Sequence, residues 1–535
     1  MSKLFSRHPF IFVFCIILLG LLLRGIEIAH KQTLSHDESI SYLSATVNQG
    51  AYQKVQEDHA YPFGVWVPAS EWKQLLAIQE PFAFAKIGRE LAQFDIHPPL
   101  YFWLLHLWTL IFGVHPWTGP TLNVVVFSGS VAALFALAKL LLKNNREALM
   151  VCLIWTVSPA VLDITVEARQ YELLGFCTIF FAWSMLRYAN SSLPHSWLKW
   201  GWLIVSVLLG ALTHYHFALV VVGMLFILFV QLLLVNRSRF FSSFVGVGVG
   251  YLIFFVLHPQ FYLSLQQLAS RQGEEVQRYW TWLDFLRRVY ATGYAYTRFW
   301  VNGDILQVAV FCLLVSSAIW MIWKFLRNPK RSIYWMRQAH IPGIEAVCLF
   351  LWIAAVTIFL YLTLLSPGNA MTTRHMSLAW PFFAFVPVSL LHLVKRRREW
   401  WQWAVVLVVM LSGLATVYFD DVRNQQVGTA VTILQSADYI VVDNVHRGIF
   451  PRIFWQIPDE TLIYAADQSH LTAFSGEWMP FIQSDATASY VSNLSYTNSA
   501  DGQDRIISLL SSEKVAVDER GQYAGSFVYQ LRVGK

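Results

Sequence analysis

The sequence PFIFVFCIILLGLLLRGIEI, from Pro9 to Ile28, is an almost unbroken apolar run near the start of the chain. A helix of this length rises about 30 Å, which matches the hydrocarbon thickness of a bilayer. Lys3 and Arg7 precede the run, and no small-residue cleavage site follows it. We therefore expect a retained membrane anchor whose N-terminus lies in the cytoplasm.

The whole chain has the composition of an integral membrane protein. Of its 535 residues, 56% are hydrophobic and 13% are charged, against about 25% charged residues in a soluble domain. The net charge of +6 comes largely from short loops, which favours a role in membrane topology and contact with the lipid bilayer over nucleic-acid binding. The five cysteines lie in apolar runs and indicate neither a disulfide framework nor a metal cluster.

Ten further apolar runs have the length of membrane helices, so we predict eleven spans. They cover 119–142, 147–163, 172–190, 200–213, 217–235, 243–262, 304–325, 343–365, 376–394 and 401–418. The stretch from Trp200 to Val235 would rise about 54 Å as one helix, so we place a turn at its one polar cluster, Thr213-His214-Tyr215-His216. The segment from Pro98 to Phe112 is short for a span, and we expect it to lie on or dip into the outer face.

The basic residues support this topology. With Pro98 to Phe112 lying flat, the short loops rich in Lys and Arg fall on the side of the N-terminus, as the positive-inside rule requires. They contain Lys139, Lys143, Arg146, Arg187, Lys199, Arg237, Arg239, Lys324, Arg327, Lys330, Arg331, Arg337 and Lys395 to Arg398. The segment 263–303 is an exception, because it carries several arginines on the outer side. We interpret its Trp280, Trp282 and Phe285 as part of an interfacial helix that faces lipid headgroups.

The composition becomes that of a soluble domain after about residue 424, and eleven spans place this tail outside the cytoplasm. The segments Asp438 to Asp443 and Thr461 to Tyr464 have the pattern of buried strands, Arg505 to Ser512 that of a helix, and Lys514 to Val533 that of a hairpin turning at Gly521. We therefore divide the chain into a transmembrane module, 1–420, and a small extracytoplasmic α/β domain, 424–535.

Polar and charged side chains gather at the outer ends of the predicted spans, although they are widely separated in the sequence. They are Asp37, Glu38, His97, Glu167, Arg169, Tyr171, His214, His216, Arg374 and His375. Charged groups near the hydrocarbon edge are unfavourable unless they are paired or hydrated. A one-sided ring of acids, bases and imidazoles therefore indicates a polar site.

The pair Asp37 and Glu38 follows the first span in the stretch Leu34-Ser35-His36-Asp37-Glu38-Ser39. Ser35 and Glu38 fit a capping box that closes the first turn of a helix, which is a structural role for Glu38. Asp37 then points about 100° away from Glu38 and is available as a general base. An aspartate can accept the proton of an alcohol while the bond to the electrophile forms.

The other candidates also have structural explanations. Prolines suit the start of a helix, which accounts for Pro98 and Pro99 and leaves His97 unexplained. Arg169 and Arg374 either extend from span ends to the interface or hold a lipid-linked phosphate and neutralise its charge as it leaves. His214 flanks the predicted turn, where histidines are more often structural, and its spacing from the next histidine does not indicate a metal site.

The order of these residues resembles that of a known family. An Asp-Glu pair after the first span is followed by Asp95-Ile96-His97-Pro98-Pro99-Leu100-Tyr101, by Glu167-Ala168-Arg169-Gln170-Tyr171, by Thr213-His214-Tyr215, and by Arg374 ahead of Pro381. Over roughly residues 1–400 this order is similar to that of the polyprenyl-phosphate-sugar-dependent glycosyltransferases of family 39. That group contains the protein O-mannosyltransferases and the lipid A aminoarabinose transferases.

The resemblance implies a GT-C fold in the cytoplasmic (inner) membrane, with juxtamembrane helices in the first outer loop. It implies inverting transfer of one sugar from a polyprenyl-phosphate donor to a lipid, glycan or protein acceptor on the extracytoplasmic face. Asp37 would be the catalytic base, and Glu38 a second acid that orients the acceptor or the base. The donor phosphate would be held by Arg169, Tyr171, Arg374 and His97, and the substrates would be contacted by Tyr101, Glu167, His214 and His375. Relatives usually carry tyrosine at the position of His375. We expect no obligatory cofactor, and a divalent metal is not indicated.

Two other functions suit a polytopic protein with basic inner loops. A transporter or flippase of lipid-linked sugars usually shows inverted repeats and ionisable groups at the membrane midplane, whereas here these groups gather at one edge. An O-antigen ligase or polymerase would act in the same compartment on a pyrophosphate-linked oligosaccharide. The sequence leaves the second alternative open.

Overall fold

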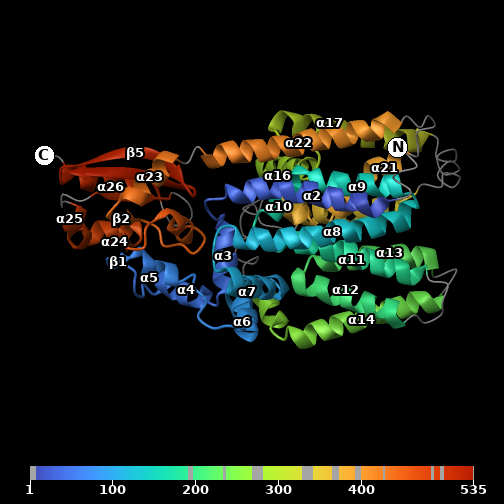
Figure 1. Ribbon diagram of the computed structural model, residues 1–535, viewed down its shortest axis with the longest axis horizontal. Coiled ribbons are helices and arrows are strands. Elements are labelled where there is room, and N and C mark those ends of the chain that lie inside the picture. Colours follow the sequence, from blue (N-terminus) through green and yellow to red (C-terminus); the bar gives the residue numbers. More distant parts are fainter. Residues whose placement is uncertain are drawn as a thin grey trace.

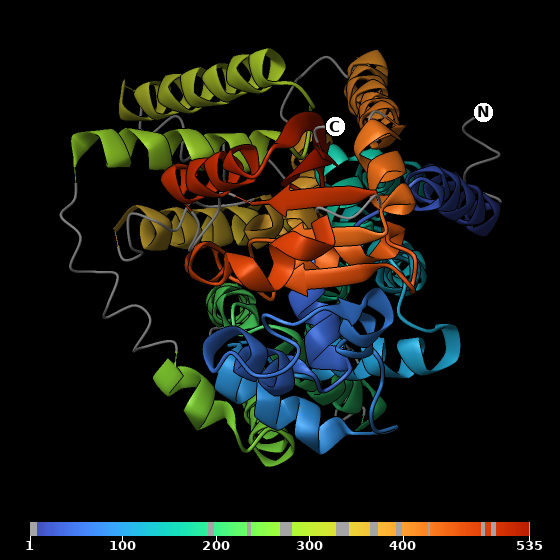
Figure 2. The ribbon, with the colours of Figure 1, turned by 90° about the vertical axis from the view of Figure 1, so that its left-hand side faces the viewer.

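The computed structural model of the chain describes residues 8–190, 197–232, 237–267, 281–327, 342–363, 373–391, 399–425, 428–482, 487–493 and 499–533. A bundle of long helices follows the longest axis, and short helices and a domain with a sheet lie together at one end of it (Figure 1). The view down the bundle shows the short helices and the C-terminal domain side by side in front of the long helices (Figure 2). We call this end of the bundle the domain end.

Each predicted span coincides with one helix or with a pair of helices. They are α2 (Pro9–Ala29), α8 (Thr118–Leu142), α9 (Asn145–Val157) with α10 (Pro159–Thr165), α11 (Tyr171–Ala189), α12 (Trp197–Thr213), α13 (Phe217–Leu232), α14 (Arg237–Leu257), α17 (Asp304–Arg327), α19 (Ile344–Thr363), α20 (Trp380–Phe383) with α21 (Phe385–Leu391), and α22 (Glu399–Gln425). Within the described ranges, four helices, in α2, α8, α14 and α22, are long and apolar enough to cross a membrane, and the bent pair α9 and α10 would make a fifth. The full count of eleven spans stays a prediction.

Successive long helices run in alternate directions, so that the start of α2 and the C-terminal domain lie at opposite ends of the bundle (Figure 1). Because α8 and α11 both leave the domain end, Lys139, Lys143 and Arg187 lie towards the other end. The predicted turn near residue 214 is confirmed, since α12 ends at Thr213 and α13 begins at Phe217. Several residues of the predicted basic loops and of the arginine-containing segment 263–303 lie outside the described residues: Arg271, Arg278, Trp280, Lys330, Arg331, Arg337 and Lys395 to Arg398.

A bend of 59° separates α9 from α10 at Ser158-Pro159. Proline favours the first position of a helix and disfavours helical backbone at the residue before it. Ser158 accordingly has φ −62° and ψ 127°, and its hydroxyl donates to the carbonyl oxygen of Phe299 at 2.8 Å. The bent pair therefore ends at the domain end, where residues 166–170 connect it to α11.

Short helices form the layer at the domain end. They are α3 (His36–Ala45), α4 (Gln49–Glu57), α5 (Ala69–Gln74), α6 (Phe84–Phe94) and α7 (Leu100–Phe112). The helix α7 is the segment expected at the outer face, and it packs against α3, α6, α8 and α12 beside the ends of the long helices (Figure 1). The segment predicted as an interfacial helix forms α16 (Trp282–Thr297), which packs against α17 and α19; the Trp282 side chain is 74% exposed.

The C-terminal domain is built on a six-stranded sheet of order β1-β3-β2-β4-β6-β5. The strands are β1 (Val67–Pro68), β2 (Tyr439–Val442), β3 (Leu462–Ala465), β4 (Ala488–Ser492), β5 (Val515–Tyr523) and β6 (Ser526–Val533). The helices of the domain are α23 (Gly428–Ser436), α24 (Gln468–Ala473), α25 (Ser475–Ile482) and α26 (Ala500–Ser512). The strands β3, β2 and β4 are parallel, and β1, β6 and β5 pair antiparallel at the two sides. The predicted small α/β domain is confirmed.

The turn predicted at Gly521 is wrong. The hairpin turns at Ala524-Gly525, where both residues have the positive φ of a two-residue hairpin turn, 53° and 78°. Gly521, with φ 115°, lies at a shift of register between Glu519 and Gln522, which is a bulge in β5. Glycine favours both features, and the sequence pattern did not separate them.

Two elements connect the C-terminal domain to the rest of the chain. The strand β1 comes from the layer of short helices and pairs with β3, with Val67 opposite Ile463. The helix α22 continues from the bundle to Gln425. The division of the chain at 420 and 424 stays a prediction, because a strand of the first module forms an edge of the second module's sheet.

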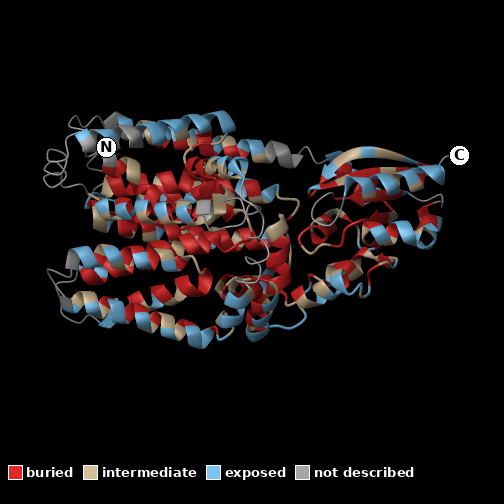
Figure 3. Ribbon diagram, turned by 180° about the vertical axis from the view of Figure 1, so that it is seen from behind, coloured by how far each residue is buried: buried red, intermediate tan, exposed pale blue. Residues whose placement is uncertain are grey.

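Exposed residues lie on the outside of the bundle and buried residues fill its middle (Figure 3). Many of the exposed residues are large and apolar. On α2, Phe10 is 72% and Phe14 is 59% exposed, and on α14 Leu252 is 64% exposed. Apolar surface of this kind requires lipid rather than water as its neighbour. The predicted multi-pass membrane protein is confirmed.

The close crossing of α22 and α9 generates a stability prediction. A Cβ atom added at Gly413 would lie 2.1 Å from the carbonyl oxygen of Val157, so Gly413→Ala forces the two helices apart. We expect a loss of about 1–3 kcal/mol, seen as a lower midpoint of thermal unfolding in detergent. Gly248→Ala in α14 is the matched control, because nothing lies within 4 Å of its added Cβ. Equal midpoints for the two variants would contradict the close crossing.

Candidate active site

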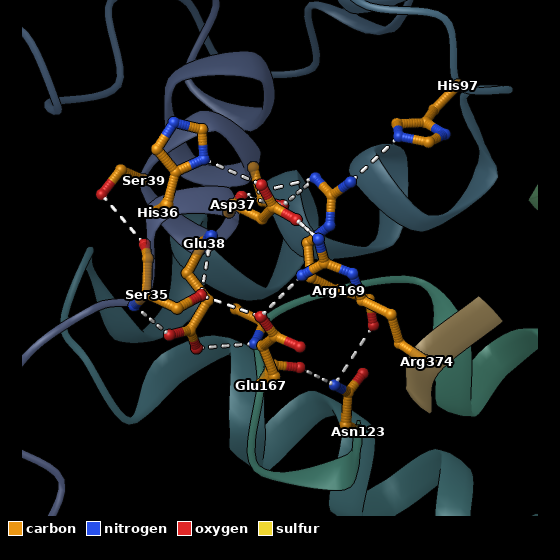
Figure 4. Close-up of polar contacts among 12 residues, drawn as sticks. Ser35, His36, Asp37, Glu38, Ser39, His97, Asn123, Glu167, Arg169 and Arg374 are labelled. Carbon is orange, nitrogen blue, oxygen red and sulfur yellow. Dashed lines mark hydrogen bonds and ion pairs between the residues drawn. The ribbon is translucent and has the colours of Figure 1, made fainter. Parts of the chain in front are cut away.

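The N-terminus of α3 is fixed by the predicted capping box. Ser35 is the N-cap; its Oγ accepts from the Glu38 backbone N–H at 3.3 Å, and Glu38 Oε2 accepts from the Ser35 backbone N–H at 2.6 Å (Figure 4). This pairing satisfies two backbone donors that the helix itself leaves without acceptors. The prediction that Glu38 closes the first turn is confirmed.

Glu38 makes two further contacts, and its side chain has no exposed surface. Its Oε2 lies 3.0 Å from Nζ of Lys31, and its Oε1 accepts from the backbone N–H of Ala168 at 2.7 Å. The carboxylate thus joins the end of the first span, α3 and the connection 166–170. Its predicted role as a second catalytic acid stays a prediction.

Asp37 points away from Glu38 towards two guanidinium groups (Figure 4). Its Oδ2 forms an ion pair with Nη2 of Arg374, and its Oδ1 lies 2.9 Å from Nδ1 of His36. The Asp37 side chain is 18% exposed. A carboxylate held in this way has one oxygen on a neighbouring ring and the other on a cation.

The two arginines differ in burial. Arg169 is 4% exposed, and its Nη1 donates to Ser41 Oγ at 3.1 Å and to the Asp37 carbonyl oxygen at 3.4 Å. The Arg374 side chain is 27% exposed; its Nη1 lies 3.4 Å from Glu167 Oε1, and its guanidinium lies 5.8 Å from the centre of the Tyr171 ring. Arg169 therefore supports α3 from within, whereas Arg374 is open to a ligand.

Side chains from two other elements hold the connection 166–170 in place. The Ser35 hydroxyl donates to Glu167 Oε1 at 2.8 Å. The Asn123 amide in α8 donates to the carbonyl oxygens of Glu167 at 2.6 Å and Arg169 at 3.4 Å. Because backbone groups in a connection lack helical partners, these bonds fix the direction in which Arg169 leaves the chain.

His97 lies on the far side of Arg169 from Asp37 (Figure 4). Arginine only donates hydrogen bonds, so the contact of 2.9 Å between Arg169 Nη2 and His97 Nε2 makes Nε2 the acceptor and places the proton on Nδ1. Burial lowers the pKa of His97 to about 4, although Asp95 acts in the opposite direction. The ring is therefore neutral at pH 7.

The remaining predicted residues surround this group. The His214 ring lies 5.5 Å from the His97 ring and 6.0 Å from the Tyr171 ring, and the His375 ring lies 6.2 Å from that of Tyr171. Tyr101 is completely buried and packs against Phe102 at 5.8 Å. Its predicted substrate contact stays a prediction, as do the roles of the other residues.

The cationic groups control the charge of Asp37. Although burial raises the pKa of Asp37, the charge of Arg169, the hydrogen bond with His36 and the charge of Arg374 together lower it well below its ordinary value. Burial raises the pKa of Glu167 above its ordinary value, against the opposing charge of Arg374. Asp37 therefore stays ionised at neutral pH and below.

Lys31, Ser41 and Asn123 contribute to the site and were not predicted. Asn123 carried a usable signal, because an amide inside a predicted span needs a hydrogen-bond partner. Lys31 and Ser41 carried none, since a lysine after a span and a serine in a helix are common. Among the described residues, no group of three or more His, Cys, Asp or Glu side chains is placed to hold a metal ion.

Comparison with known proteins shows similarity to a protein family and to solved structures, among them two of ArnT. Residues 96–262 match the family described as dolichyl-phosphate-mannose-protein mannosyltransferase. The structure is similar to that of ArnT from Cupriavidus metallidurans bound to undecaprenyl phosphate, with a TM-score of 0.49, 11% identity and 97% of each chain covered. It is also similar to the apo state of that ArnT, with a TM-score of 0.48, 10% identity and 97% of each chain covered. A search of curated sequences gave no match.

The matched segment contains His97, Arg169, Tyr171 and His214. The predicted resemblance to the lipid-phosphate-sugar-dependent glycosyltransferases is confirmed. Residues 96–262 of this multi-pass membrane protein are thus similar to the family described as dolichyl-phosphate-mannose-protein mannosyltransferase.

The buried position of Glu38 generates a second stability prediction. Glu38→Gln removes the charge that pairs with Lys31, and we expect a loss of about 3 kcal/mol, measured as a lower midpoint of thermal unfolding. Glu460→Gln, at an exposed position before β3, is the control and should change stability by less than about 0.5 kcal/mol. If Glu38→Gln and Glu460→Gln have the same midpoint of thermal unfolding, the Glu38 carboxylate does not join the three segments.

Proposed function

We propose that the protein is an inverting glycosyltransferase that moves one sugar from a polyprenyl-phosphate donor to an acceptor hydroxyl on the extracytoplasmic face of the membrane. The observation that carries this proposal is the pairing of Asp37 with the partly exposed Arg374 at the domain end of the bundle. A base and a cation side by side are the two groups that displacement of a phosphate from a sugar requires.

In the proposed reaction the acceptor oxygen attacks the anomeric carbon from the face opposite the phosphate. Asp37 accepts the hydroxyl proton while the new carbon–oxygen bond forms. The bond between the anomeric carbon and the phosphate oxygen breaks, and its electron pair stays on the polyprenyl phosphate. Attack and departure on opposite faces invert the configuration at that carbon.

Arg374 is proposed to receive the developing phosphate charge. Its side chain is 27% exposed, and its two terminal nitrogens contact two separate carboxylates, those of Asp37 and Glu167. Two terminal donors of this kind suit two oxygens of one phosphate. Arg169 is almost completely buried. We therefore assign Arg169 the task of keeping Asp37 and His97 in position, with Tyr171 and His97 lining the phosphate side.

The same proposal covers cofactor, acceptor and location. The guanidinium of Arg374 next to the leaving group supplies positive charge of the kind that a divalent metal supplies in other transferases, so we propose that no metal is obligatory. The acceptor is a lipid, a glycan or a protein.

We propose that the protein lies in the cytoplasmic membrane with its N-terminus inside, because Lys139, Lys143 and Arg187 lie at the end of the bundle opposite the C-terminal domain.

Asp37→Asn tests the function. The amide keeps the shape of the side chain but cannot accept the proton, so we expect a loss of at least about 10²-fold in turnover, measured with a panel of radiolabelled polyprenyl-phosphate sugars and detergent-solubilised protein. Asp504→Asn, exposed on α26, is the matched control and should keep wild-type turnover.

The same panel separates the alternatives. A wild-type protein that consumes only pyrophosphate-linked oligosaccharides would be a ligase or polymerase. A protein that moves labelled donor across liposomes without cleaving it would be a transporter. Full turnover by Asp37→Asn would remove Asp37 as the base.

The lowered pKa of Asp37 generates a prediction about pH. A transfer rate that needs ionised Asp37 is at its maximum above this lowered pKa and falls only when the pH drops through it. Protonation of Asp37 should therefore not reduce the wild-type rate at any pH down to about 5. Arg374→Gln removes a charge that lowers the pKa of Asp37. The carboxylate then takes up its proton at higher pH, and the acidic side of the profile moves upwards.

The measurement is the pH profile of transfer, with each enzyme normalised to its own maximum, because Arg374→Gln also weakens phosphate binding. Arg520→Gln in the C-terminal domain is the control and should reproduce the wild-type shape. Superimposable profiles for Arg374→Gln and the wild type would show that Arg374 does not act on the ionisation of Asp37.

A further inference from the structure

The C-terminal domain contacts the segment of chain that leads into α3. The Arg452 Nε donates to the Leu34 carbonyl oxygen at 2.8 Å, and the Thr33 hydroxyl donates to the Arg452 carbonyl oxygen at 3.2 Å. The Tyr523 hydroxyl donates to the Gln32 carbonyl oxygen at 3.1 Å. Gln32, Thr33 and Leu34, which lead into α3, are therefore held by a domain that begins about 400 positions later in the sequence.

One contact of the domain reaches the side chain that binds Asp37. The rings of His36 and His446 are stacked, with centroids 5.5 Å apart and an interplanar angle of 20°. His36 Nδ1 lies 2.9 Å from Asp37 Oδ1. Because Asp37 is ionised, Nδ1 of His36 is the donor in this bond. The stacking therefore acts on the imidazole that orients the proposed base.

The His446 ring is itself fixed by its own loop. The backbone N–H of Gly448 donates to His446 Nδ1 at 3.1 Å, and the His446 backbone N–H donates to Asn444 Oδ1 at 2.7 Å. Burial lowers the pKa of His446 to about 4, which agrees with an Nδ1 that accepts a backbone hydrogen bond. The loop thus presents a neutral, flat ring to His36.

Gly448 leaves the space that the His36 ring occupies. A Cβ atom added at Gly448 would lie 2.2 Å from His36 Nε2 and 2.3 Å from its Cδ2. Contacts this short do not occur between non-bonded atoms, so any side chain at Gly448 would displace the ring. In the loop after β2, His446 therefore stacks on His36, and Gly448 must stay without a side chain beside the same ring.

We infer that residues 444–450 of the C-terminal domain are a positioning element of the catalytic site. His446 and Gly448 hold the His36 ring so that its Nδ1–H binds Asp37 Oδ1 and leaves Oδ2 on the side of Arg374. The inference rests on the proposed role of Asp37 as the base. It adds that the C-terminal domain is part of the active site and that its loop 444–450 sets the direction of the Asp37 carboxylate.

Gly448→Ala is the first test. Displacement of His36 turns Asp37 away from the acceptor, and misplacement of a reacting group by about 1 Å can cost about 10²-fold in rate. We expect kcat to fall at least about tenfold while KM for the donor changes less than about twofold. Gly476→Ala in α25, where nothing lies within 4 Å of the added Cβ, is the matched control and should keep both constants.

His446 provides a second test that does not depend on Gly448→Ala folding. His446→Phe keeps a flat ring against His36 and should retain kcat, whereas His446→Ala removes the ring and should lose it. A structural role for the loop alone would lower the thermal unfolding midpoint of both variants without this difference in kcat. Wild-type turnover by His446→Ala, or equal loss in both variants, would overturn the inference.

A chemical measurement separates this inference from the proposed function. Diethyl pyrocarbonate modifies accessible imidazoles, and mass spectrometry follows His36 against His59, whose side chain is 52% exposed, as the internal reference. We expect faster modification of His36 in His446→Ala than in the wild type, and a wild-type rate in His446→Phe. If wild-type protein transfers no sugar but this pattern holds, the proposed function fails and the positioning contact stands. Unchanged modification of His36 in His446→Ala overturns the contact whatever the activity.

Discussion

A carboxylate at the edge of an apolar helix bundle stays ionised only if other groups replace its lost hydration, and the domain end of this protein is organised around that constraint. Arg169 and Arg374 surround Asp37, and each comes from a different part of the chain. The bend at Pro159 brings the connection with Arg169 to the domain end, and the contacts of Glu38 and Asn123 hold it there. Loss of any of these supports leaves a charge near hydrocarbon without its partner.

The same pairing limits how basic Asp37 can be before substrate arrives. A carboxylate bound to Arg374 attracts a proton weakly, whereas a base for an alcohol must attract one strongly. Under the proposed function, a donor phosphate competes with Asp37 for Arg374, because both are anions that suit a guanidinium. Binding of the donor then releases Asp37 Oδ2 and raises its basicity at the moment when an acceptor needs it. Arg374 would thus couple occupancy of the donor site to activation of the base.

Local features were predictable from the sequence, and long-range contacts were not. The capping box of Ser35 and Glu38, the turn before Phe217 and the strands β2 and β3 depend on neighbouring residues, and the structure has all of them. The stacking of His36 on His446 joins residues that no local pattern connects. The hairpin turn was misplaced because Gly521 and Gly525 have the same backbone freedom and only the strand register distinguishes them. The charged residues near the membrane edge indicated that a site exists. Which of these side chains contact one another depends on how the helices pack.

The pairing of β1 with β3 has a consequence for how the protein is made. Val67 is synthesised long before its partner Ile463, so β1 has no partner until β3 has been made. The long helices α2 to α22 all precede β3 in the chain, and the loop with His446, which stacks on His36, lies between β2 and β3. Assembly of the domain end is thereby delayed until β3 has been made, and a chain truncated before β3 would contain the long helices without the completed site.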